Sequence, residues 1–375
     1  MTDIKNINII LSVNKNNMCI NTVDLELQNY LLKCLNQFQK NNQIKPNITI
    51  EFSSDKNNTK IEKYIDILLL NFNNFENIKL DTSFNNSEFI DFSFFSQLKN
   101  VEFKSYKNFY YNFKFPNNLK SINFISSEYF DNNIGNLPSE LKIIKFGKNF
   151  NQPISNLPNK LKKLYFGDSF NQLVNNLPSG LKILSFSSCS VFNQPLDNLP
   201  LGLKELYLGQ NFLHNLDFLP NTIEIISIDL SSYFNFPIDN LPYGLKKLSL
   251  NVDFFQSLDN LPDSVEELVI TSKSNIINKF PYALKKLSIN IDQLDKINLL
   301  DDISIEKLSL QNYYTENTDY KSNLKKFKIP KSLIKLKSNI NISSISWLCE
   351  YANQNNYVVK KRKYNTRFVM SKIID

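Results

Sequence analysis

The dipeptide Leu-Pro, or Phe-Pro in its place, recurs every 19 to 22 residues through the middle of this 375-residue chain. Leu-Pro stands at residues 137, 157, 177, 199, 219, 241 and 261, and Phe-Pro stands at 115 and 280. Nine of the fourteen prolines therefore hold one position of one repeated unit. Self-similarity at such a period indicates a solenoid, in which each unit packs only against its neighbours.

A strand-like segment follows each of these pairs, with the pattern Leu-x-x-Leu-x-Phe, as in LKKLYF at 161, or an aliphatic variant of it, as in IEIISI at 223. Proline fixes its own φ and pushes the preceding residue towards an extended conformation, so Leu157-Pro158 directs the chain into the strand. We expect Leu161, Leu164 and Phe166 to be buried on the side of the strand that faces the core.

One repeat cannot fold alone. Its five or so apolar side chains provide about 1.5–3 kcal/mol each, against roughly 1–2 kcal/mol of backbone entropy for each of about twenty residues. Stacked repeats bury both faces of every turn, and their strands pair into a parallel sheet with a spacing of about 4.8 Å. Fainter copies of the strand carry the array from Phe75 to Pro330, so we predict one solenoid over residues 75–330.

The segment before the array has a different pattern. Residues 1–74 read as strand, helix, strand and helix, and we predict that they form a small α/β N-terminal cap. The signals are an apolar run over 7–13, a helical face at Leu27, Leu31, Leu35 and Phe38, a strand over 48–52, and a capping box at Thr59–Glu62 that opens a helix through Leu70.

Residues 331–375 are predicted to form a helix-strand C-terminal cap. Ile345, Leu348 and Ala352 lie on one face of a helix, and the basic tail that follows can return as an edge strand. Such caps cover the apolar cross-section that the last repeats would otherwise expose.

Composition restricts the class of protein. No run approaches the roughly 18 apolar residues of a spanning helix, and no signal peptide is visible at the N-terminus. The four cysteines, at 19, 34, 189 and 349, form neither a CxxC pair nor a disulfide framework. We therefore expect a cytoplasmic protein that has no membrane segment and no cofactor.

Catalytic signatures are lacking as well. His214 is the only histidine, which excludes a catalytic triad or a histidine-rich metal site, and it stands where Gln152 and Gln194 stand in other repeats. Cys189 and Cys349 have no other cysteine near them in the sequence. Isolated cysteines behave as small hydrophobic residues, so we predict that both are structural. The sequence contains no GxGxxG, Walker or GxSxG motif and no recurrent carboxylate pair. We predict that the protein is not an enzyme.

Segments that begin with Phe-Asn resemble the FNIP repeat: FNQPI at 150, FNQPL at 192 and FNFPI at 234. This leucine-rich-repeat-like unit of about 22 residues has a Phe-Asn-x-Pro start, a Leu-Pro pair and a Leu-x-x-Leu-x-Phe strand. The resemblance is good over 130–268 and is typical of social amoebae and their giant viruses. It implies an α/β, leucine-rich-repeat-like solenoid with a parallel sheet on its concave face and short irregular loops on its convex face.

Some FNIP-repeat proteins carry an N-terminal F-box that recruits a ubiquitin ligase. No Leu-Pro precedes Leu137, and strand–helix alternation over 1–74 is unlike an all-helical F-box, so we recognise none. The repeats also resemble the Leu-Pro repeats of secreted bacterial effectors, some of which carry a cysteine ubiquitin ligase after the array. About 45 residues follow Pro330, too few for that domain.

Two further columns of residues are predicted to be structural. Stacked in register, the amides that precede Leu-Pro can pair with one another and with turn backbone groups, which indicates an asparagine ladder. Its members are Asn136, Asn156, Asn176, Asn198, Asn240 and Asn260. The aromatic column is predicted to be a core stack, formed by Phe150, Phe170, Phe192, Phe212 and Phe234.

The strand positions between the buried ones are the candidate binding residues. They point away from the core and vary between repeats, and they mix aromatic, aliphatic and charged groups as protein-binding faces do. Gly167 falls in this series. The candidate partner-binding residues on the concave face are Lys145, Lys163, Tyr165, Ser185, Glu205, Tyr207, Ser227, Lys247, Ser249 and Lys286. We predict a monomeric, non-enzymatic scaffold for a protein partner, with substrate recognition as one form of this role and a merely solvated face as the alternative.

A second alternative is binding of nucleic acid or another acidic surface through lysine. The net charge is +7, but Arg362 and Arg367 are the only arginines, whereas base recognition relies on arginine. Nucleic acid is therefore the less favoured partner. The residues concerned are Lys142, Lys162, Lys182, Lys204, Lys246 and Lys285, with the tail Lys360, Lys361, Arg362 and Lys363.

Overall fold

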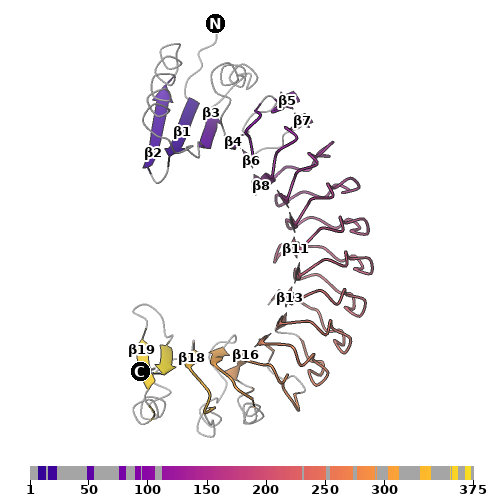
Figure 1. The fold of residues 1–375 in the computed structure, drawn as a ribbon, viewed down its shortest axis with the longest axis vertical. Coiled ribbons are helices and arrows are strands. Elements are labelled where there is room, and N and C mark those ends of the chain that lie inside the picture. The colour runs from indigo at the N-terminus through magenta and orange to yellow at the C-terminus, as the bar shows by residue number, and fades with distance from the viewer. Residues whose placement is uncertain are drawn as a thin grey trace. The chain divides into compact units, whose positions relative to one another are not determined.

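The structure is a computed structural model, and many of its strands are labelled in Figure 1. It describes residues 7–13, 16–22, 49–54, 76–81, 89–93, 95–105, 112–229, 232–250, 254–272, 277–291, 293, 303–311, 330–338, 355, 357–361 and 368–372. The chain divides into two compact units, Met1–Phe186 and Ser187–Asp375. Each unit contains a sheet in which one strand comes from each successive repeat.

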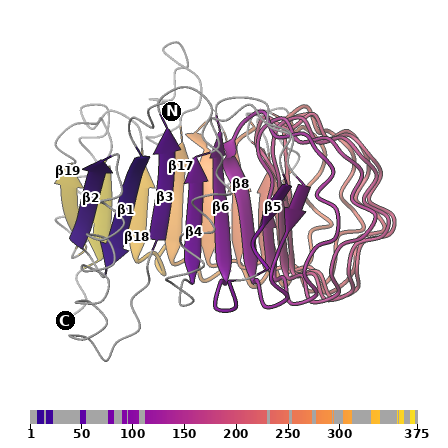
Figure 2. The same ribbon diagram turned by 90° about the horizontal axis from the view of Figure 1, so that it is seen from above.

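In its described residues the first unit contains eleven strands, nine of which form its main sheet. Strands β3 to β11 of this sheet run parallel (β3–β4–β6–β8–β9–β10–β11), and β5 pairs with β7 in a separate parallel ribbon beside them (Figure 2). The bounds are β1 (Ile7–Val13), β2 (Asn16–Thr22), β3 (Thr49–Ser54), β4 (Asn77–Asp81), β5 (Phe89–Asp91), β6 (Asn100–Ser105), β7 (Asn112–Lys114), β8 (Ser121–Ser127), β9 (Ile143–Lys145), β10 (Lys163–Phe166) and β11 (Ile183–Phe186).

The N-terminal segment differs from the prediction in one strand. The expected strands are present as β1 and β3, but β1 is followed by a second strand, β2, which pairs with it antiparallel. Strand β1 also pairs antiparallel with β3, so a β-hairpin lies beside the first parallel strand. The helices predicted over 27–38 and 59–70 lie outside the described residues.

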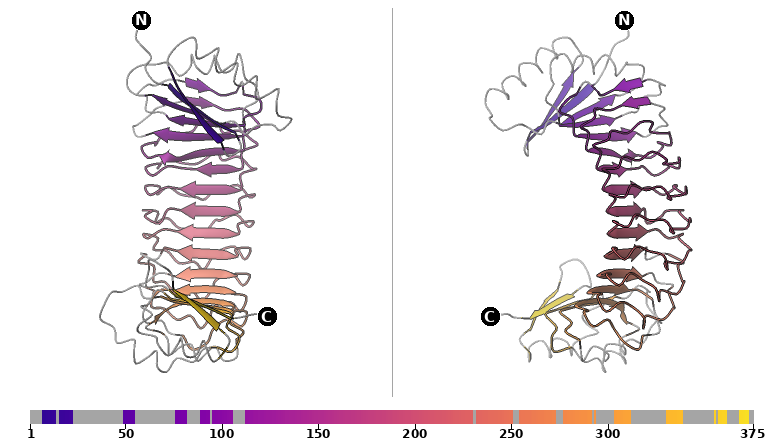
Figure 3. Two further views of the ribbon diagram at one scale, coloured as in Figure 1. Left: turned by 90° about the vertical axis from the view of Figure 1, so that its left-hand side faces the viewer. Right: turned by 45° about the vertical axis from the view of Figure 1, so that its right-hand side comes forward.

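Among the described residues of the second unit there are nine strands, of which β12 to β18 run parallel (Figure 3). The chain then returns, because β20 pairs antiparallel with β18 and β19 pairs antiparallel with β20. The bounds are β12 (Glu205–Leu208), β13 (Ile225–Ile228), β14 (Lys247–Leu250), β15 (Glu267–Ile270), β16 (Lys286–Asn290), β17 (Lys307–Gln311), β18 (Lys335–Ser338), β19 (Tyr357–Lys361) and β20 (Phe368–Lys372).

The described residues contain strands and turns but no α-helix. In this part of the chain the fold is therefore a parallel β-solenoid of stacked coils, whereas the sequence suggested an α/β class. The helix predicted around Ile345, Leu348 and Ala352 lies outside the described part. The basic tail, expected as one edge strand, supplies the two strands β19 and β20.

In the repeats that carry the proline, a β-turn precedes the strand, and the proline carbonyl accepts its hydrogen bond. The amide of Leu161 donates to the carbonyl oxygen of Pro158 at 3.0 Å. Proline suits this first turn position because the turn uses only its carbonyl group. The amide of Leu333 donates to Pro330 in the same way at 3.1 Å, so the turn and strand of the repeat continue past residue 330.

Most repeats are either 20 or 22 residues long, and this difference has a local cause. The longer repeats insert two residues between the strand and the buried loop phenylalanine. Ser190 and Ser232 lie there, fully buried. The amide of Phe192 donates to Ser190 Oγ at 3.1 Å, and the amide of Phe234 donates to Ser232 Oγ at 3.0 Å. The buried insertion is thus hydrogen-bonded, and the strands around Ser232, β13 and β14, stay in register.

The loop phenylalanines stack in the core, as predicted. Ring centroids of Phe150 and Phe170 lie 6.2 Å apart in the first unit, with an interplanar angle of 3°. In the second unit Phe212 lies 6.3 Å from both Phe192 and Phe234. All five are at most 1% exposed, so the column is core and offers no surface to a ligand.

The asparagines that precede Leu-Pro do not form the predicted ladder. All six are exposed, and Asn240 and Asn260 donate to the carboxylates of Asp217 and Asp239 at 3.1 and 3.0 Å. This position lies on the surface, where water can satisfy an amide without a neighbouring amide.

The ladder is formed by the asparagine that follows the loop phenylalanine. The side-chain oxygen of Asn151 accepts the backbone amide of Asn171, one repeat on, at 2.8 Å. Asn193 accepts the amide of Leu213 at 2.9 Å in the same way. These bonds satisfy loop N–H groups that no strand pairs, and they tie each repeat to the next.

Gly167 lies where two repeats approach too closely for a side chain. A Cβ atom at this position would lie 2.1 Å from the carbonyl oxygen of Gly147. The expectation that Gly167 belongs to the outward series is therefore wrong, because this backbone faces the preceding repeat. Glycine is required here for close contact between backbones.

Replacing Asn151 with alanine should lower the free energy of unfolding by about 1–3 kcal/mol, because the amide of Asn171 loses its acceptor. Asn156→Ala, in the same repeat but at an exposed position, should change it by less than about 0.5 kcal/mol. Urea denaturation of both variants measures the difference. Equal effects would contradict the assignment of the ladder to Asn151.

Candidate binding face of the sheet

Alternation along each strand gives the sheet two faces. In β10, Leu164 and Phe166 are buried in the core, while Lys163 is exposed and Tyr165 is half-buried on the opposite side. We call this opposite side the outward face. The residues that share it pair in register across neighbouring strands, as Tyr165 does with Ser185. None of the ten predicted site residues is buried. Contact of a partner with them remains a prediction.

In the first unit the outward face combines aromatic, aliphatic and charged groups. The ammonium nitrogen of Lys145 lies 5.4 Å from the ring centroid of Tyr165, within the range of a cation–π interaction. Ile143 and Ile183, on the flanking strands, are half-buried beside Lys163. This combination of an aromatic ring, a cation and aliphatic groups is typical of protein-binding surfaces.

In the second unit the outward face carries fixed charges. The hydroxyl of Tyr207 donates to the carboxylate of Glu205 at 2.9 Å. Glu267 accepts from Lys247 at 2.5 Å and from Lys286 at 3.2 Å, on the strands to either side. Partial burial raises the pKa of Glu267, but the hydrogen bonds from the two lysines outweigh it and hold the pKa below its ordinary value of 4.5.

The predicted lysine row is interrupted by carboxylates. Glu224 accepts from Lys204 at 2.6 Å and from Lys246 at 2.9 Å, and hydrogen bonds from these lysines lower its pKa. Glu266 accepts from Lys285 at 3.0 Å. These described lysines are thus neutralised within the chain, which disfavours a phosphate-binding row. Of the basic tail, Arg362 and Lys363 lie outside the described residues.

The histidine and the cysteines were the remaining candidates for a catalytic or metal-binding role. His214 Nε2 lies 3.2 Å from the carbonyl oxygen of Asn193, so it contacts the preceding repeat, as a structural polar residue does. Cys189 is an exposed free cysteine rather than the small hydrophobic residue we expected, and Cys349 lies outside the described part. No group of three potential metal ligands occurs among the residues that the structure describes.

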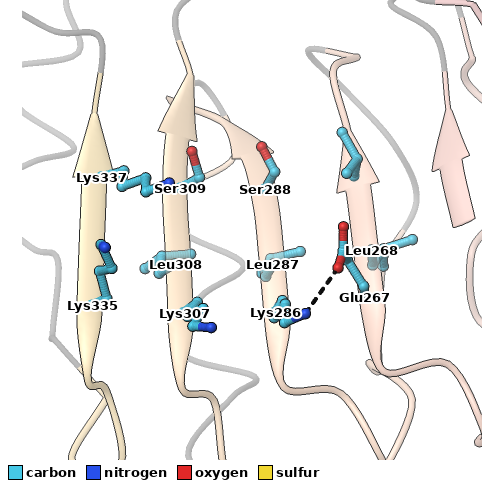
Figure 4. A pocket seen from close by; sticks show the side chains of 11 residues that line it. Glu267, Leu268, Lys286, Leu287, Ser288, Lys307, Leu308, Ser309, Lys335 and Lys337 are labelled. Atoms are coloured by element: carbon cyan, nitrogen blue, oxygen red, sulfur yellow. Dashed lines mark hydrogen bonds and ion pairs between the residues drawn. The ribbon is translucent and has the colours of Figure 1, made fainter. Parts of the chain in front are cut away.

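A shallow hollow of about 310 Å³ lies on the outward face over β15 to β18 (Figure 4). Its charged residues are Glu267, Lys286, Lys307, Lys335 and Lys337. Of these, only Lys286 was among the predicted site residues. A signal for the others exists in the segments IEKLSL at 305 and LIKLKS at 333, which place lysine at outward strand positions. Irregular spacing after β16 obscured it.

Comparison with a solved structure shows that the fold is similar to a leucine-rich-repeat solenoid. The crystal structure of CroV588, described as a novel circular LRR protein, is 23% identical with a TM-score of 0.52. The match covers 72% of this chain and 47% of CroV588, so this chain spans about half the length of CroV588. YopM from Yersinia enterocolitica WA-314 is 16% identical, with a TM-score of 0.28 over 70% of this chain and 80% of its own.

The repeat itself belongs to a named type. The family model for the FNIP repeat matches residues 130–157 and 155–189, so this part of the chain consists of FNIP repeats, as the sequence indicated. No curated protein matches the chain in sequence. The described residues include no helix of the length and hydropathy needed to cross a membrane.

The dependence of stability on pH tests the ion pairs between carboxylates and lysines beside the turns that precede the strands. Hydrogen bonds from Lys160 and Lys120 lower the pKa of Glu140 from 4.5 to about 2. Because the folded-state pKa is lowered, the stabilisation is complete above pH 4.5 and is lost as pH falls towards 2. We expect the melting temperature of the wild type to fall more steeply over this range than that of Glu140→Gln. Parallel curves would show that Glu140 is not held by these lysines.

Proposed function

We propose that the protein is a non-enzymatic scaffold that binds a protein partner on the outward face of its sheets, which we take to be the concave face. The solenoid supplies rigidity, and the outward side chains supply specificity. Recognition of a substrate for another enzyme is one form that this role can take. We propose a monomeric protein that acts in the cytoplasm.

One observation carries the proposal: the two faces of the same strands differ in how much they vary. On the core side, Leu206, Ile226 and Leu248 pair in register and are all aliphatic. The adjacent outward column contains Glu205, Ile225 and Lys247 in the same register. The next outward column changes from Tyr207 through Ser227 and Ser249 to Val269.

A face that served only solubility would need polar residues alone. Here half-buried aliphatic and aromatic side chains alternate with charged ones, which is the composition of a recognition surface. Ion pairs such as Lys286–Glu267, at 3.2 Å, restrict the positions of the charged groups before a partner arrives. Restricting side chains in advance lowers the entropy lost on binding.

Nucleic-acid binding is the less supported function. Lysines of the predicted row pair with Glu224 and Glu266, so fewer cations are available for phosphate. Phosphate binding would produce an affinity that falls steeply with salt, because neutralised phosphates release counterions. A mobility-shift titration at two salt concentrations therefore separates this function from recognition of a protein.

The test of the scaffold uses two pairs of tyrosines. Replacing both Tyr165 and Tyr207 with alanine removes two rings from the outward faces. The matched control replaces Tyr243 and Tyr282, which are 74% and 81% exposed in the opening turns. We expect proteins captured from the native cell to be lost with the first variant and retained with the second, as quantitative mass spectrometry would show. Melting temperatures should remain close to that of the wild type, because these are surface substitutions.

Retention of every captured protein by the variant that lacks Tyr165 and Tyr207 would contradict the assignment of binding to the outward face. Equal loss from both variants would contradict it as well, since the turn tyrosines lie outside that face.

A further inference from the structure

Three neighbouring strands at the C-terminal end of the parallel sheet gather lysines on the outward face. Lys286, Lys307 and Lys335 pair in register on β16, β17 and β18. Lys337 lies two residues beyond Lys335, on the same face of β18. Since neighbouring strands lie about 4.8 Å apart, four ammonium groups share a small area of the sheet.

Among the described residues, the carboxylates that pair with Lys204, Lys246 and Lys247 have no counterpart beside these strands other than Glu267. Glu267 pairs with Lys286 from β15, on one side of the group. Lys307, Lys335 and Lys337 form no ion pair with any of the described residues. Like charges held this close repel one another, so an anion that bound between them would be attracted by all three.

The hairpin that follows extends the same charge. Lys337 lies opposite Val369 of β20, and Val369 lies opposite Lys360 of β19. Directly opposed residues share one face of a sheet, so the exposed Lys360 is on the outward face as well. Basic residues on this face therefore lie on β16, β17, β18 and β19, with Val369 of β20 between Lys337 and Lys360.

Hydrogen-bonding groups lie among the lysines. Ser288 and Ser309 are half-buried in the hollow, and the side chain of Lys337 extends towards Ser309 in Figure 4. Ser309 Oγ accepts from Gln311 Nε2 at 2.6 Å, which leaves its hydroxyl hydrogen able to donate. The hollow of about 310 Å³ is at the lower limit for ligand pockets, so it accommodates a few side chains rather than a large cofactor.

We propose that Lys307, Lys335 and Lys337, with Lys286, bind an extended acidic segment of a partner protein. This proposal rests on the proposed function and names the chemistry of the partner. Alternate residues of an extended chain lie about 6.6–6.8 Å apart. Acidic residues at alternate positions can thus reach lysines of neighbouring strands, whose long side chains absorb the difference in spacing.

The described outward residues favour an acidic protein segment over nucleic acid. Single-stranded nucleic acid is bound by aromatic rings on which bases stack. The outward positions of β15 to β18 in the hollow are serine, valine, lysine and glutamate, without an aromatic residue. Both arginines of the chain lie outside the described residues, so these strands offer ammonium groups alone, which attract carboxylates as point charges.

The test measures binding of a fluorescent synthetic peptide of alternating glutamate and serine to the full chain by anisotropy at low salt. We expect the variant Lys307→Gln/Lys335→Gln/Lys337→Gln to bind at least about tenfold more weakly. The control variant removes the same charge from three other repeats, at the residue just before the strand: Lys142→Gln/Lys162→Gln/Lys182→Gln. It should bind the peptide nearly as tightly as the wild type does. Raising the salt concentration should weaken binding to the wild type, because exposed charges are screened.

A charge-reversed variant, Lys307→Glu/Lys335→Glu/Lys337→Glu, provides a second readout. It should reject the glutamate peptide and bind a peptide of alternating lysine and serine instead. Circular dichroism of each variant checks that the sheet is intact. If the spectrum of the glutamate variant is altered, the peptide affinity of the glutamine variant alone tests the proposal.

Three results would overturn the proposal. They are absence of binding to the wild type at low salt, equal binding by the two glutamine variants, and tighter binding of a single-stranded oligonucleotide than of the acidic peptide. The tyrosine experiment distinguishes this failure from failure of the scaffold. Loss of captured proteins on removal of Tyr165 and Tyr207, with no acidic peptide bound, would leave the outward face as the binding face but exclude this partner chemistry.

Discussion

Contact between one repeat and the next is the interaction on which the rest of the structure depends. Parallel strand pairing supplies it on one side of each coil, and on the other the Asn151 side chain accepts the Asn171 amide at 2.8 Å. The phenylalanine column fills the space between, with Phe150 and Phe170 stacked at 6.2 Å. No repeat buries enough surface to be stable alone, so each contact stabilises both of its partners.

The sequence predicted the parts of the fold that depend on local pattern. The strand alternation and the phenylalanine column follow from residue type and period, and both are found. Proline was expected to direct the chain into the strand, and the structure shows that a turn lies between them. The asparagine ladder was assigned to the wrong column, because Asn151 and Asn156 are equally periodic and only geometry shows which one meets the neighbouring repeat. Strand β2 was missed because its pairing with β1, rather than its own pattern, makes it a strand.

In the candidate site, too, the features set by local pattern were predicted and those set by strand pairing were not. Alternation alone placed Lys163, Tyr165 and Lys286 on the outward face, and the structure agrees. Alternation could not reveal the lysine cluster on β16 to β18. The cluster depends on which strands are neighbours, and the Leu-Pro spacing that indicates neighbours elsewhere is absent after residue 281. Lys307 and Lys335 are 28 residues apart in sequence yet directly paired. Glu267 pairs with the lysines on both sides of it, Lys247 and Lys286, and the accumulation of lysines beyond it is visible only in the assembled sheet.

The buried serines of the longer repeats have a consequence for how such an array changes through descent. Ser190 and Ser232 mark one point in the coil where two residues can enter while their own hydroxyls satisfy the chain. Units of 20 and 22 residues are therefore interchangeable modules. Duplication or loss of a whole unit leaves every later strand facing the same way, so recognition surfaces can be recombined without the frame of the sheet being lost.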